Sequence, residues 1–381
     1  MRRIAIVTGS RGEYGYIRPI IKRIKASKNL DYNVIATNLH LLSDFGFSLK
    51  EIEQDGIKVT DKIYMALDGY TTATMAKSLG IFLMGLTDAL VRMRPDIMLL
   101  AGDRGEQLMA AIAAAHMNIP VAHIQAGELS GNIDGMTRHA IARYAHIHFA
   151  ANKDAGERLK RSGEQEFRIF VTGAPQLDEL VNGEFAPAAE VAKAYSLQKG
   201  KPIILFLHHP VTEEYGETVI QVREALEAIC QLGHQTVSIF PNNDAGNEEI
   251  RRMVEQYHQP FIRVERNMPR RMYLGLMRVA TVMVGNSSSG LIEAPVFHLP
   301  AVNIGSRQRG RVRGSNVIDV SADRSAIKKA VERAMSPNFL ARLRKNGSNP
   351  YLGDGDVSKR IVDILRDIPV DEKLLKKQLA Y

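Results

Sequence analysis

The chain has one cysteine and no tryptophan among its 381 residues. A single thiol, Cys230, excludes an internal disulfide and any metal site built from several cysteines. Its place in an apolar helical pattern favours a core residue over a reactive one. We therefore expect a cytoplasmic protein, because the cytoplasm keeps thiols reduced.

Aromatic residues are scarce at 6%, while the formal net charge is +8. A basic protein can bind nucleic acid, an acidic membrane or an anionic small molecule. The basic residues are spread along the chain, with one dense cluster at 307–313, and few clustered aromatics could stack bases. An anionic small molecule is therefore favoured, and a nucleic-acid partner is not expected.

Long hydrophobic runs are also missing, since no stretch of about 18 consecutive apolar residues occurs. The segment 1–9 has an apolar core of only four residues, which predicts a first strand and not a signal peptide. Neither a transmembrane helix nor a membrane partner is expected.

Short apolar runs alternate with longer amphipathic stretches along the whole chain. The predicted strands are 4–7, 33–36, 97–100, 121–124, 169–171, 203–207, 236–240, 262–264, 282–284, 301–303 and 317–319. The main predicted helices are 75–92, 106–116, 137–145, 219–232, 248–257, 272–279 and 325–335. This alternation predicts an α/β fold of parallel sheets with helices on both faces.

The length favours two domains, because one hydrophobic core rarely serves so many residues. The alternation pauses between Gly173 and Pro202, in a stretch rich in glycine and proline. We predict a Rossmann-like domain at 1–174 and a second one at 175–360. A C-terminal helix and tail, 361–381, follow, and these could cross back to the first domain.

The segment Gly285-Asn286-Ser287-Ser288-Ser289-Gly290 follows the predicted strand 282–284 and precedes helix-forming residues. This pattern predicts a strand, a tight turn and a helix start, where backbone N–H groups, serine hydroxyls and the helix dipole attract a phosphate. An ordinary serine N-cap is the alternative. After the first strand, Arg11 could hold a phosphate or face solvent, and no Gly-x-Gly-x-x-Gly pattern supports a dinucleotide site.

Three acids, Asp103, Glu128 and Asp134, follow two neighbouring predicted strands. Because ligands of such sheets bind at the carboxyl ends of the strands, we expect all three at one cleft. Grouped carboxylates raise one another's pKa values, so that one can hold a proton while another accepts one. Capping or turn formation is the alternative for each acid, above all for Asp134 ahead of the helix predicted from Thr137.

His209 stands before Pro210 at the end of the strand 203–207, which holds it in an extended conformation. Such a histidine can donate to a phosphate or act as an acid. Its neighbour His208 points to the opposite side, so the two make a poor metal-chelating pair and no metal site is expected. Glu293 could accept hydrogen bonds from a ribose or complement a helix N-terminus.

Over essentially its whole length, the chain resembles the hydrolysing UDP-N-acetylglucosamine 2-epimerases of sialic-acid biosynthesis. The segments that carry the resemblance keep the family's order and spacing; they are Thr8–Gly15, Gly102–Arg104, Ala126–Glu128, Arg138-His139, His209-Pro210, Pro241–Gly246, Gly285–Gly290 and Gly305–Arg311. The resemblance implies a GT-B-like fold of two Rossmann-like domains facing a cleft. UDP would be bound mainly by the second domain, with the sugar in the cleft.

The resemblance also implies the reaction: loss of the C2 proton with cleavage of the C1–O bond, then addition of water to the 2-acetamidoglucal. It implies no cofactor and assigns catalytic roles to Asp103, Glu128, Asp134 and His209. The residues it implies as contacts of a UDP-sugar are Arg11, His40, Arg104, Arg138, His139, Asn243, Gly285, Asn286, Ser287, Ser288, Glu293 and Arg311. A homodimer or homotetramer is expected, with the helix at 75–92 either in the contact or in the core.

Gly15-Tyr16 replaces the Ser-Lys of some relatives, which bears on the identity of the sugar. UDP-N-acetylglucosamine, giving N-acetylmannosamine, is the first expectation, and UDP-2,4-diacetamido-2,4,6-trideoxyglucose, on the route to legionaminic acid, is the second. A non-hydrolysing 2-epimerase, a glycosyltransferase of the same fold and a non-catalytic nucleotide or nucleic-acid binder are the alternatives.

Overall fold

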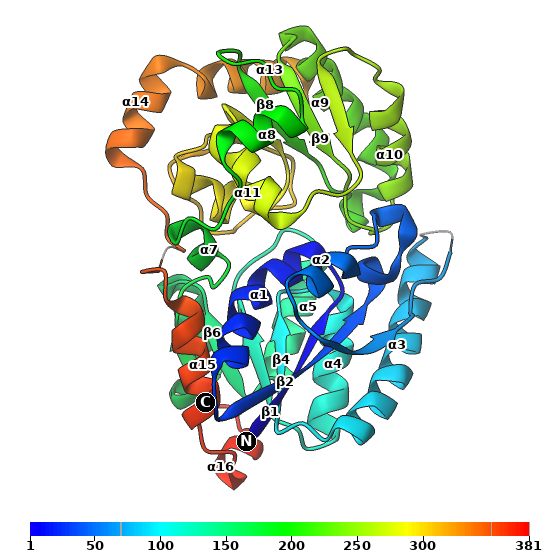
Figure 1. The fold of residues 1–381 in the computed structure, drawn as a ribbon, viewed down its shortest axis with the longest axis vertical. Coiled ribbons are helices and arrows are strands. Elements are labelled where there is room, and N and C mark those ends of the chain that lie inside the picture. The colour runs from blue at the N-terminus through cyan, green and yellow to red at the C-terminus, as the bar shows by residue number, and fades with distance from the viewer. Residues whose placement is uncertain (69–70, 352, 381) are drawn as a thin grey trace.

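Two parallel β-sheets form the frame of the molecule (Figure 1). The computed structural model describes residues 1–68, 71–351 and 353–380. The first sheet has the strand order β3-β2-β1-β4-β5-β6-β7, and the second has the order β10-β9-β8-β11-β12-β13. The predicted α/β class with two Rossmann-like parallel sheets is confirmed.

The first sheet and its helices come mainly from the first half of the chain. Its strands are β1 (Arg2–Thr8), β2 (Leu30–Thr37), β3 (Val59–Ile63), β4 (Ile97–Ala101), β5 (Val121–Ile124), β6 (Ile147–Ala150) and β7 (Ile169–Val171). Its α-helices are α1 (Arg11–Ala26), α2 (Leu49–Gln54), α3 (Thr72–Met93), α4 (Gly105–His116), α5 (Ile133–Tyr144) and α6 (Lys153–Arg161). Short 3₁₀ turns are η1 (Asn38–Leu41), η2 (Ser43–Phe45) and η3 (Glu166–Arg168).

The chain passes from the first sheet to the second through α7 (Leu177–Val181) and α8 (Ala188–Ala194). The second sheet consists of β8 (Ile203–Leu207), β9 (Gln235–Ile239), β10 (Ile262–Glu265), β11 (Val282–Gly285), β12 (Ala301–Ile304) and β13 (Val317–Val320). Around it lie η4 (Thr212–Glu217), α9 (Thr218–Leu232), α10 (Asn247–Gln256), α11 (Arg270–Val279), α12 (Ser289–Ile292), η5 (Ala294–Phe297), α13 (Arg324–Ala334) and α14 (Pro337–Asn346). The exact domain limits stay a prediction.

Central strands of both sheets are apolar throughout, as strands covered on both faces must be. All five residues of β4 and all five of β8 are buried. Every strand predicted from the sequence is present in the structure, but the sequence pattern missed β3 and β6. In β3 a polar Thr-Asp-Lys core marks a sheet edge, and in β6 His148 interrupts the apolar run, although Glu164 satisfies it there at 2.9 Å.

Two helix starts differ from the expectation. Glycine and proline within α1 mask its helical pattern, yet Ser10 and Glu13 form a reciprocal capping box at its first turn. The start predicted at Thr137 is wrong, because α5 begins at Ile133 with Asn132 in the N-cap position. Asp134 therefore lies inside the first turn of α5 and does not cap the helix.

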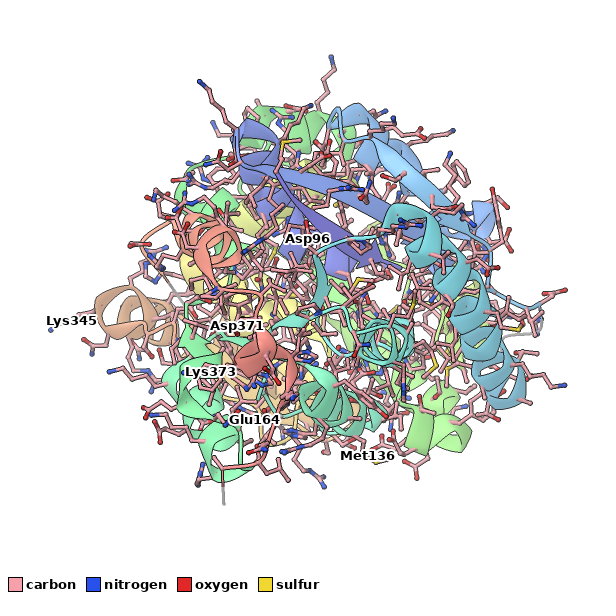
Figure 2. All side chains as sticks on the ribbon, turned by 90° about the horizontal axis from the view of Figure 1, so that it is seen from below. Asp96, Met136, Glu164, Lys345, Asp371 and Lys373 are labelled. Atoms are coloured by element: carbon pink, nitrogen blue, oxygen red, sulfur yellow. The ribbon has the colours of Figure 1, made fainter. Side chains whose placement is uncertain are left out.

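The end of the chain returns to the first domain. Helix α15 (Val357–Asp367) packs against α1, and its Ile361 and Leu365 are buried in the core of the first domain. Beyond it, α16 (Glu372–Leu375) lies on the underside of that domain, where Asp371 and Lys373 are seen near Glu164 (Figure 2). Lys377 then pairs with the buried Glu164 at 2.6 Å, which fixes the tail in place.

Helix α3 is long and apolar enough to cross a membrane by length and composition, with a mean hydropathy of 1.3 over its best window. The search for about 18 consecutive apolar residues did not single out this helix, and the absence of a transmembrane helix stays a prediction. Lys77 and Asp88 break the run into short pieces, so counting consecutive apolar residues overlooks it. Only 28% of the most apolar 18-residue stretch of α3 is buried. The buried residues of α3 face α4 and the sheet.

Candidate active site

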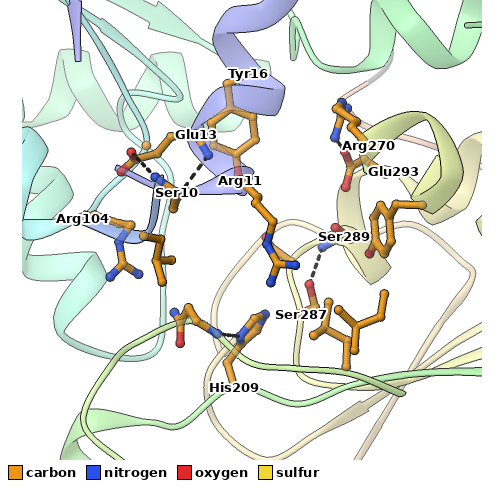
Figure 3. A pocket seen from close by; sticks show the side chains of 18 of the residues that line it. Ser10, Arg11, Glu13, Tyr16, Arg104, His209, Arg270, Ser287, Ser289 and Glu293 are labelled. Carbon is orange, nitrogen blue, oxygen red and sulfur yellow. Dashed lines mark hydrogen bonds and ion pairs between the residues drawn. The ribbon is translucent and has the colours of Figure 1, made fainter. Parts of the chain in front are cut away.

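A cavity of about 190 Å³ lies between the two domains, at the carboxyl ends of their strands. Its walls come from the loops after β1 and β4 and the start of α5 on one side, and from those after β8, β9, β10 and β11 on the other. Figure 3 shows Ser10 and Arg104 on one side of the cavity, Ser289, Glu293 and Arg270 opposite them, and Arg11 between. Both halves of the chain therefore contribute polar groups to one site.

Arg11 extends across this cavity from the first turn of α1. Its guanidinium donates to Asn267 Oδ1 at 2.8 Å and to the carbonyl of Phe240 at 3.4 Å, both in the second domain. The capping box orients the turn that carries Arg11, since Glu13 accepts from the backbone N–H of Ser10 at 3.2 Å and also from that of Gly9 at 2.6 Å. A guanidinium in this central position is available to an anionic ligand.

Two of the predicted acids, Asp103 and Asp134, line the cavity. Burial raises the pKa of Asp134 to about 6, and the negative charge of Asp103 adds to this effect. For Asp103 burial also acts upward, but Arg138, Arg311 and further arginines outweigh it, and the pKa falls below its usual value. The pair therefore combines a stably ionised carboxylate with one that exchanges a proton near neutral pH.

The third predicted acid, Glu128, lies outside the lining of the cavity. It is buried and accepts two hydrogen bonds from Arg311, at 3.0 and 2.6 Å, across the domain interface. Arg311, expected as a nucleotide contact, is likewise absent from the lining. The structure thus joins these two residues to each other, outside the lining of the cavity.

His209 lines the cavity from the loop after β8 and is held on both sides. Asn286 accepts from its backbone N–H at 2.7 Å and donates to its carbonyl at 2.8 Å. The ring Nδ1 accepts from the backbone N–H of Asn242 at 3.1 Å, which leaves the proton on Nε2. Burial and the nearby Arg307 keep the pKa of His209 well below its usual range, so the ring is a neutral donor.

The turn between β11 and α12 has the predicted strand–turn–helix form. Gly285 has φ of 134°, and a Cβ there would lie 2.0 Å from the carbonyl oxygen of Leu207, so only glycine fits. Ser287 and Ser288 line the cavity, and Ser287 accepts from the N–H of Ser289 at 3.4 Å. Helix α12 is a single turn of four residues, so the expected help from a helix dipole is small, and the turn's own N–H and hydroxyl groups remain as anion donors.

Glu293, a predicted contact, faces the cavity beside Arg270. The sequence analysis missed Arg270. Arg270 pairs with Glu293 at 3.0 Å and with the buried Glu179 at 2.5 Å. A Cβ on Gly15 would lie 2.7 Å from its guanidinium, which explains why this position has no side chain. Arg270 stands just after β10, so the strand-end rule that found the acids could have found it too.

Among the further lining residues, Tyr273 was missed, and Arg307 was seen only as part of a basic cluster. Tyr273 follows Arg270 on α11, and Arg307 pairs with Asp134 at 3.3 Å. Tyr16 also lines the cavity, and burial raises its pKa to about 12, so its phenol stays neutral. No sequence signal singles out Tyr273, since it reads as one more apolar position of a helix.

Several predicted contacts lie outside the main cavity. His40 is buried between Thr8 at 2.9 Å and Ser48 at 2.8 Å, and burial lowers its pKa to about 3, which gives it a structural role in this conformation. Arg138 is buried, pairs with Asp103 and donates to the carbonyl of Gln125 at 2.7 Å. His139 does not line the cavity either.

Arg104 lines the main cavity and reaches over the domain interface. It donates to Asn243 at 3.1 Å and to Asp244 at 2.9 Å, both in the second domain. Asn243, a predicted contact, lines an adjoining cavity and not the main one. Within the described ranges, no group of three or more His, Cys, Asp or Glu side chains could hold a metal ion.

Comparison with known proteins identifies the family. The sequence model described as UDP-N-acetylglucosamine 2-epimerase matches residues 22–366. The UDP-N,N'-diacetylbacillosamine 2-epimerase (hydrolyzing) of Legionella pneumophila is 38% identical and covers 100% of both chains. The GDP/UDP-N,N'-diacetylbacillosamine 2-epimerase (hydrolyzing) of Campylobacter jejuni is 33% identical over 89% of this chain and 88% of its own.

Two of the similar proteins come from Neisseria meningitidis. A curated UDP-N-acetylglucosamine 2-epimerase from this organism is 31% identical over 96% of this chain and 100% of its own. The crystal structure of a UDP-GlcNAc 2-epimerase from it, bound to UDP-GlcNAc, has the same fold, with a TM-score of 0.80 at 20% identity over 96% and 99% of the two chains. The chain therefore belongs to the UDP-N-acetylglucosamine 2-epimerase family and is an enzyme of its hydrolysing nucleotide-sugar 2-epimerase group.

Proposed function

We propose that this enzyme hydrolyses and epimerises UDP-2,4-diacetamido-2,4,6-trideoxyglucose, that is, UDP-N,N'-diacetylbacillosamine. The observation that carries the proposal is the 38% identity, over both full lengths, to a relative named for that substrate, against 31% to one named for UDP-N-acetylglucosamine. This reverses the order of the two sugars expected from the sequence. The products are UDP and the free 2,4-diacetamido sugar inverted at C2.

The nucleotide is proposed to lie against the second domain. Ser287 and Ser288 would donate to the diphosphate, and Glu293, fixed by Arg270, would accept from the ribose hydroxyls. Arg11 would meet the diphosphate from the other domain. A relative of the same fold that binds UDP-GlcNAc supports a UDP-sugar as the ligand.

In the first step Asp134 is proposed to remove the proton from C2 as the C1–O bond breaks. Its pKa of about 6 leaves it ionised at neutral pH yet basic enough to take a proton. UDP departs with the bonding electrons. Arg11, Arg307 and the neutral ring of His209 stabilise the charge on its leaving oxygen. The sugar is left as the 2-acetamidoglucal.

In the second step water adds across the double bond, with hydroxyl going to C1 and a proton to C2. Asp103, which stays ionised beside Arg138, is suited to accept the proton of the attacking water. A solvent water gives its proton to C2 on the face opposite to the one first deprotonated, which yields the inverted sugar. The protons held by Asp134 and Asp103 then return to solvent. The sum of both steps consumes one water and releases UDP and the free sugar.

The substrate is tested by comparing kcat/KM for the two UDP-sugars in a coupled assay for UDP release. We expect the 2,4-diacetamido sugar to be turned over with the higher kcat/KM. A higher value for UDP-N-acetylglucosamine would contradict the proposed substrate and keep the family reaction. A product that retains UDP would instead indicate the non-hydrolysing reaction.

We also propose a homodimer or homotetramer in the cytoplasm, without nucleic-acid or membrane partners. Support for the oligomer comes from α3, whose Met84 and Val91 are 66% and 56% exposed although the helix is strongly apolar. Exposed apolar surface of this kind marks interfaces with other molecules.

A further inference from the structure

A side cavity of about 120 Å³ adjoins the substrate cavity, and Arg104 and Asp134 line both. The residues that line the side cavity but not the substrate cavity include Asn38, Met75, Leu79, Ile133, Thr137 and Asn243. It has room for several ligand atoms, since one water molecule needs about 10–15 Å³ of such space. The two cavities thus meet at Asp134, the proposed base.

Because Arg104 lines both cavities, we take its side chain as the partition between them. Arg104 pairs with Glu106 at 3.2 Å and with Asp244 at 2.9 Å. The partition is a side chain and not backbone, so a ligand that offers Arg104 a carbonyl oxygen could pass beside it. In Figure 3, Arg104 lies on the side of the cavity away from Ser289 and Glu293, where the nucleotide is proposed.

The lining of the side cavity combines amide groups and apolar side chains with the charged groups of Arg104, Glu106, Asp134 and Asp244. Asn243 donates to Asn38 Oδ1 at 2.6 Å, which places two amides side by side. In the described part of the chain, the hydroxyl of Thr137 makes no hydrogen bond, so it is free to bind a ligand. Met75, Leu79 and Ile133 supply the apolar surface.

A small residue keeps this apolar wall in place. A Cβ on Gly105 would lie 2.7 Å from Leu79 Cδ2, so Leu79 packs directly on the backbone at the start of α4. A group with an amide and one methyl fits such surroundings, because the amide finds donors and acceptors and the methyl leaves water. A sugar hydroxyl alone would leave the apolar wall uncovered.

The chemistry of the substrate says which group reaches this cavity. In a pyranose C4 lies across the ring from C1, and C1 carries the UDP. With UDP proposed at the serine turn, C4 would lie at the end of the sugar farthest from the nucleotide, and Arg104 lies on that side of the cavity in Figure 3. Given the proposed function, on which this inference rests, we infer that the side cavity receives the acetamido group on C4 and so selects the diacetamido sugar.

The test fills the cavity and compares two substrates. Met75→Trp is assayed with the 2,4-diacetamido UDP-sugar and with its analogue bearing a free 4-amino group. We expect kcat/KM to fall roughly 10-fold or more for the acetylated sugar only, because a steric mismatch in a binding pocket usually costs at least that factor. Ala76→Trp is the matched control, because Ala76 is the next residue on α3 and is exposed to solvent.

A second variant tests the inference by a gain of activity. Met75→Ala enlarges the cavity, and we expect it to raise kcat/KM for a 4-propionamido analogue relative to the acetamido sugar. An equal loss on both sugars with Met75→Trp, or no change of preference in either variant, would overturn the inference. If the wild-type enzyme does not turn over the diacetamido sugar at all, the proposed substrate fails, which is a separate result.

Discussion

At the scale of single residues, the two cavity carboxylates differ in charge because their neighbours differ. Asp103 faces several arginines and stays ionised, whereas Asp134 is buried beside that negative charge and has a pKa of about 6. Similar side chains in one cavity thus acquire separate tasks. The assignment of Asp134 as the base rests on this difference.

Asp134→Asn should lower kcat by roughly 10²- to 10⁴-fold, the usual contribution of a general base. In the wild-type enzyme kcat/KM should rise with pH through about 6, because the base must be ionised. The folded pKa lies above the unfolded one, so ionised Asp134 weakens the fold above about pH 6. The variant should therefore lose activity without losing thermal stability at pH 7. Asp154→Asn, on the exposed side of α6, is the control, and a pH-independent kcat/KM in this range would contradict the assignment.

Glu128 and Arg311 should prove more important for stability than the exposed ion pairs do. Glu128→Gln leaves a buried guanidinium without its carboxylate, which costs about 3–5 kcal/mol in the free energy of unfolding. Urea denaturation followed by circular dichroism measures this loss. Glu372→Gln, in an exposed pair with Lys376, should leave the midpoint unchanged. Equal midpoints for both variants would show that the buried pair does not hold the domains together.

At the scale of elements, the turn from β11 into α12 is the feature on which nucleotide binding is proposed to depend. Its backbone is set by Gly285, whose missing side chain lets β11 approach the end of β8. Changing this residue should therefore alter the turn without touching any catalytic group.

Gly285→Ala should weaken UDP binding, measured by calorimetry, and lower the melting temperature, because the new Cβ would collide with a backbone carbonyl. Gly305→Ala is the matched control: its φ of 78° is also positive, but nothing lies within 4 Å of an added Cβ. The control should lose only the conformational cost of about 1–2 kcal/mol. If both variants bound UDP equally well, the turn would not be the nucleotide site.

The same elements show what local sequence reveals. Apolar β4 and β8 and the polar residues that follow them were predictable, because strand burial and strand-end placement are local rules. The pairing of Glu128 with Arg311 was not, since the two residues lie 183 positions apart and meet only when the domains pack. His40 was expected at the ligand, but its two hydrogen bonds to Thr8 and Ser48 depend on the packing of β1, η1 and the start of α2.

At the scale of the whole molecule, two sheets are joined by ion pairs that cross the cleft. Arg104 to Asp244 and Arg307 to Asp134 both link the domains at the rim of the cavity. A substrate that binds Arg104 or Arg307 competes with these pairs. Binding and the relative position of the domains are therefore coupled through the same side chains.

Helix α3 should mediate the proposed oligomer. Met84→Glu puts a charge on its exposed apolar side and should convert the oligomer to a monomer, measured by light scattering after gel filtration. Val219→Glu, at a position 37% exposed on the second domain, is the control and should stay oligomeric. A monomeric wild-type protein would refute the oligomer, and binding of that monomer to lipid vesicles would assign the exposed side of α3 to a membrane.

The most direct measurement is proton NMR of the purified enzyme with UDP-2,4-diacetamido-2,4,6-trideoxyglucose in D₂O. The proposed mechanism predicts free UDP together with a free 2,4-diacetamido sugar of the manno configuration that carries deuterium at C2, since the proton added there comes from solvent. Retention of the original proton at C2, or a product still attached to UDP, would contradict the elimination and hydration at Asp134 and Asp103.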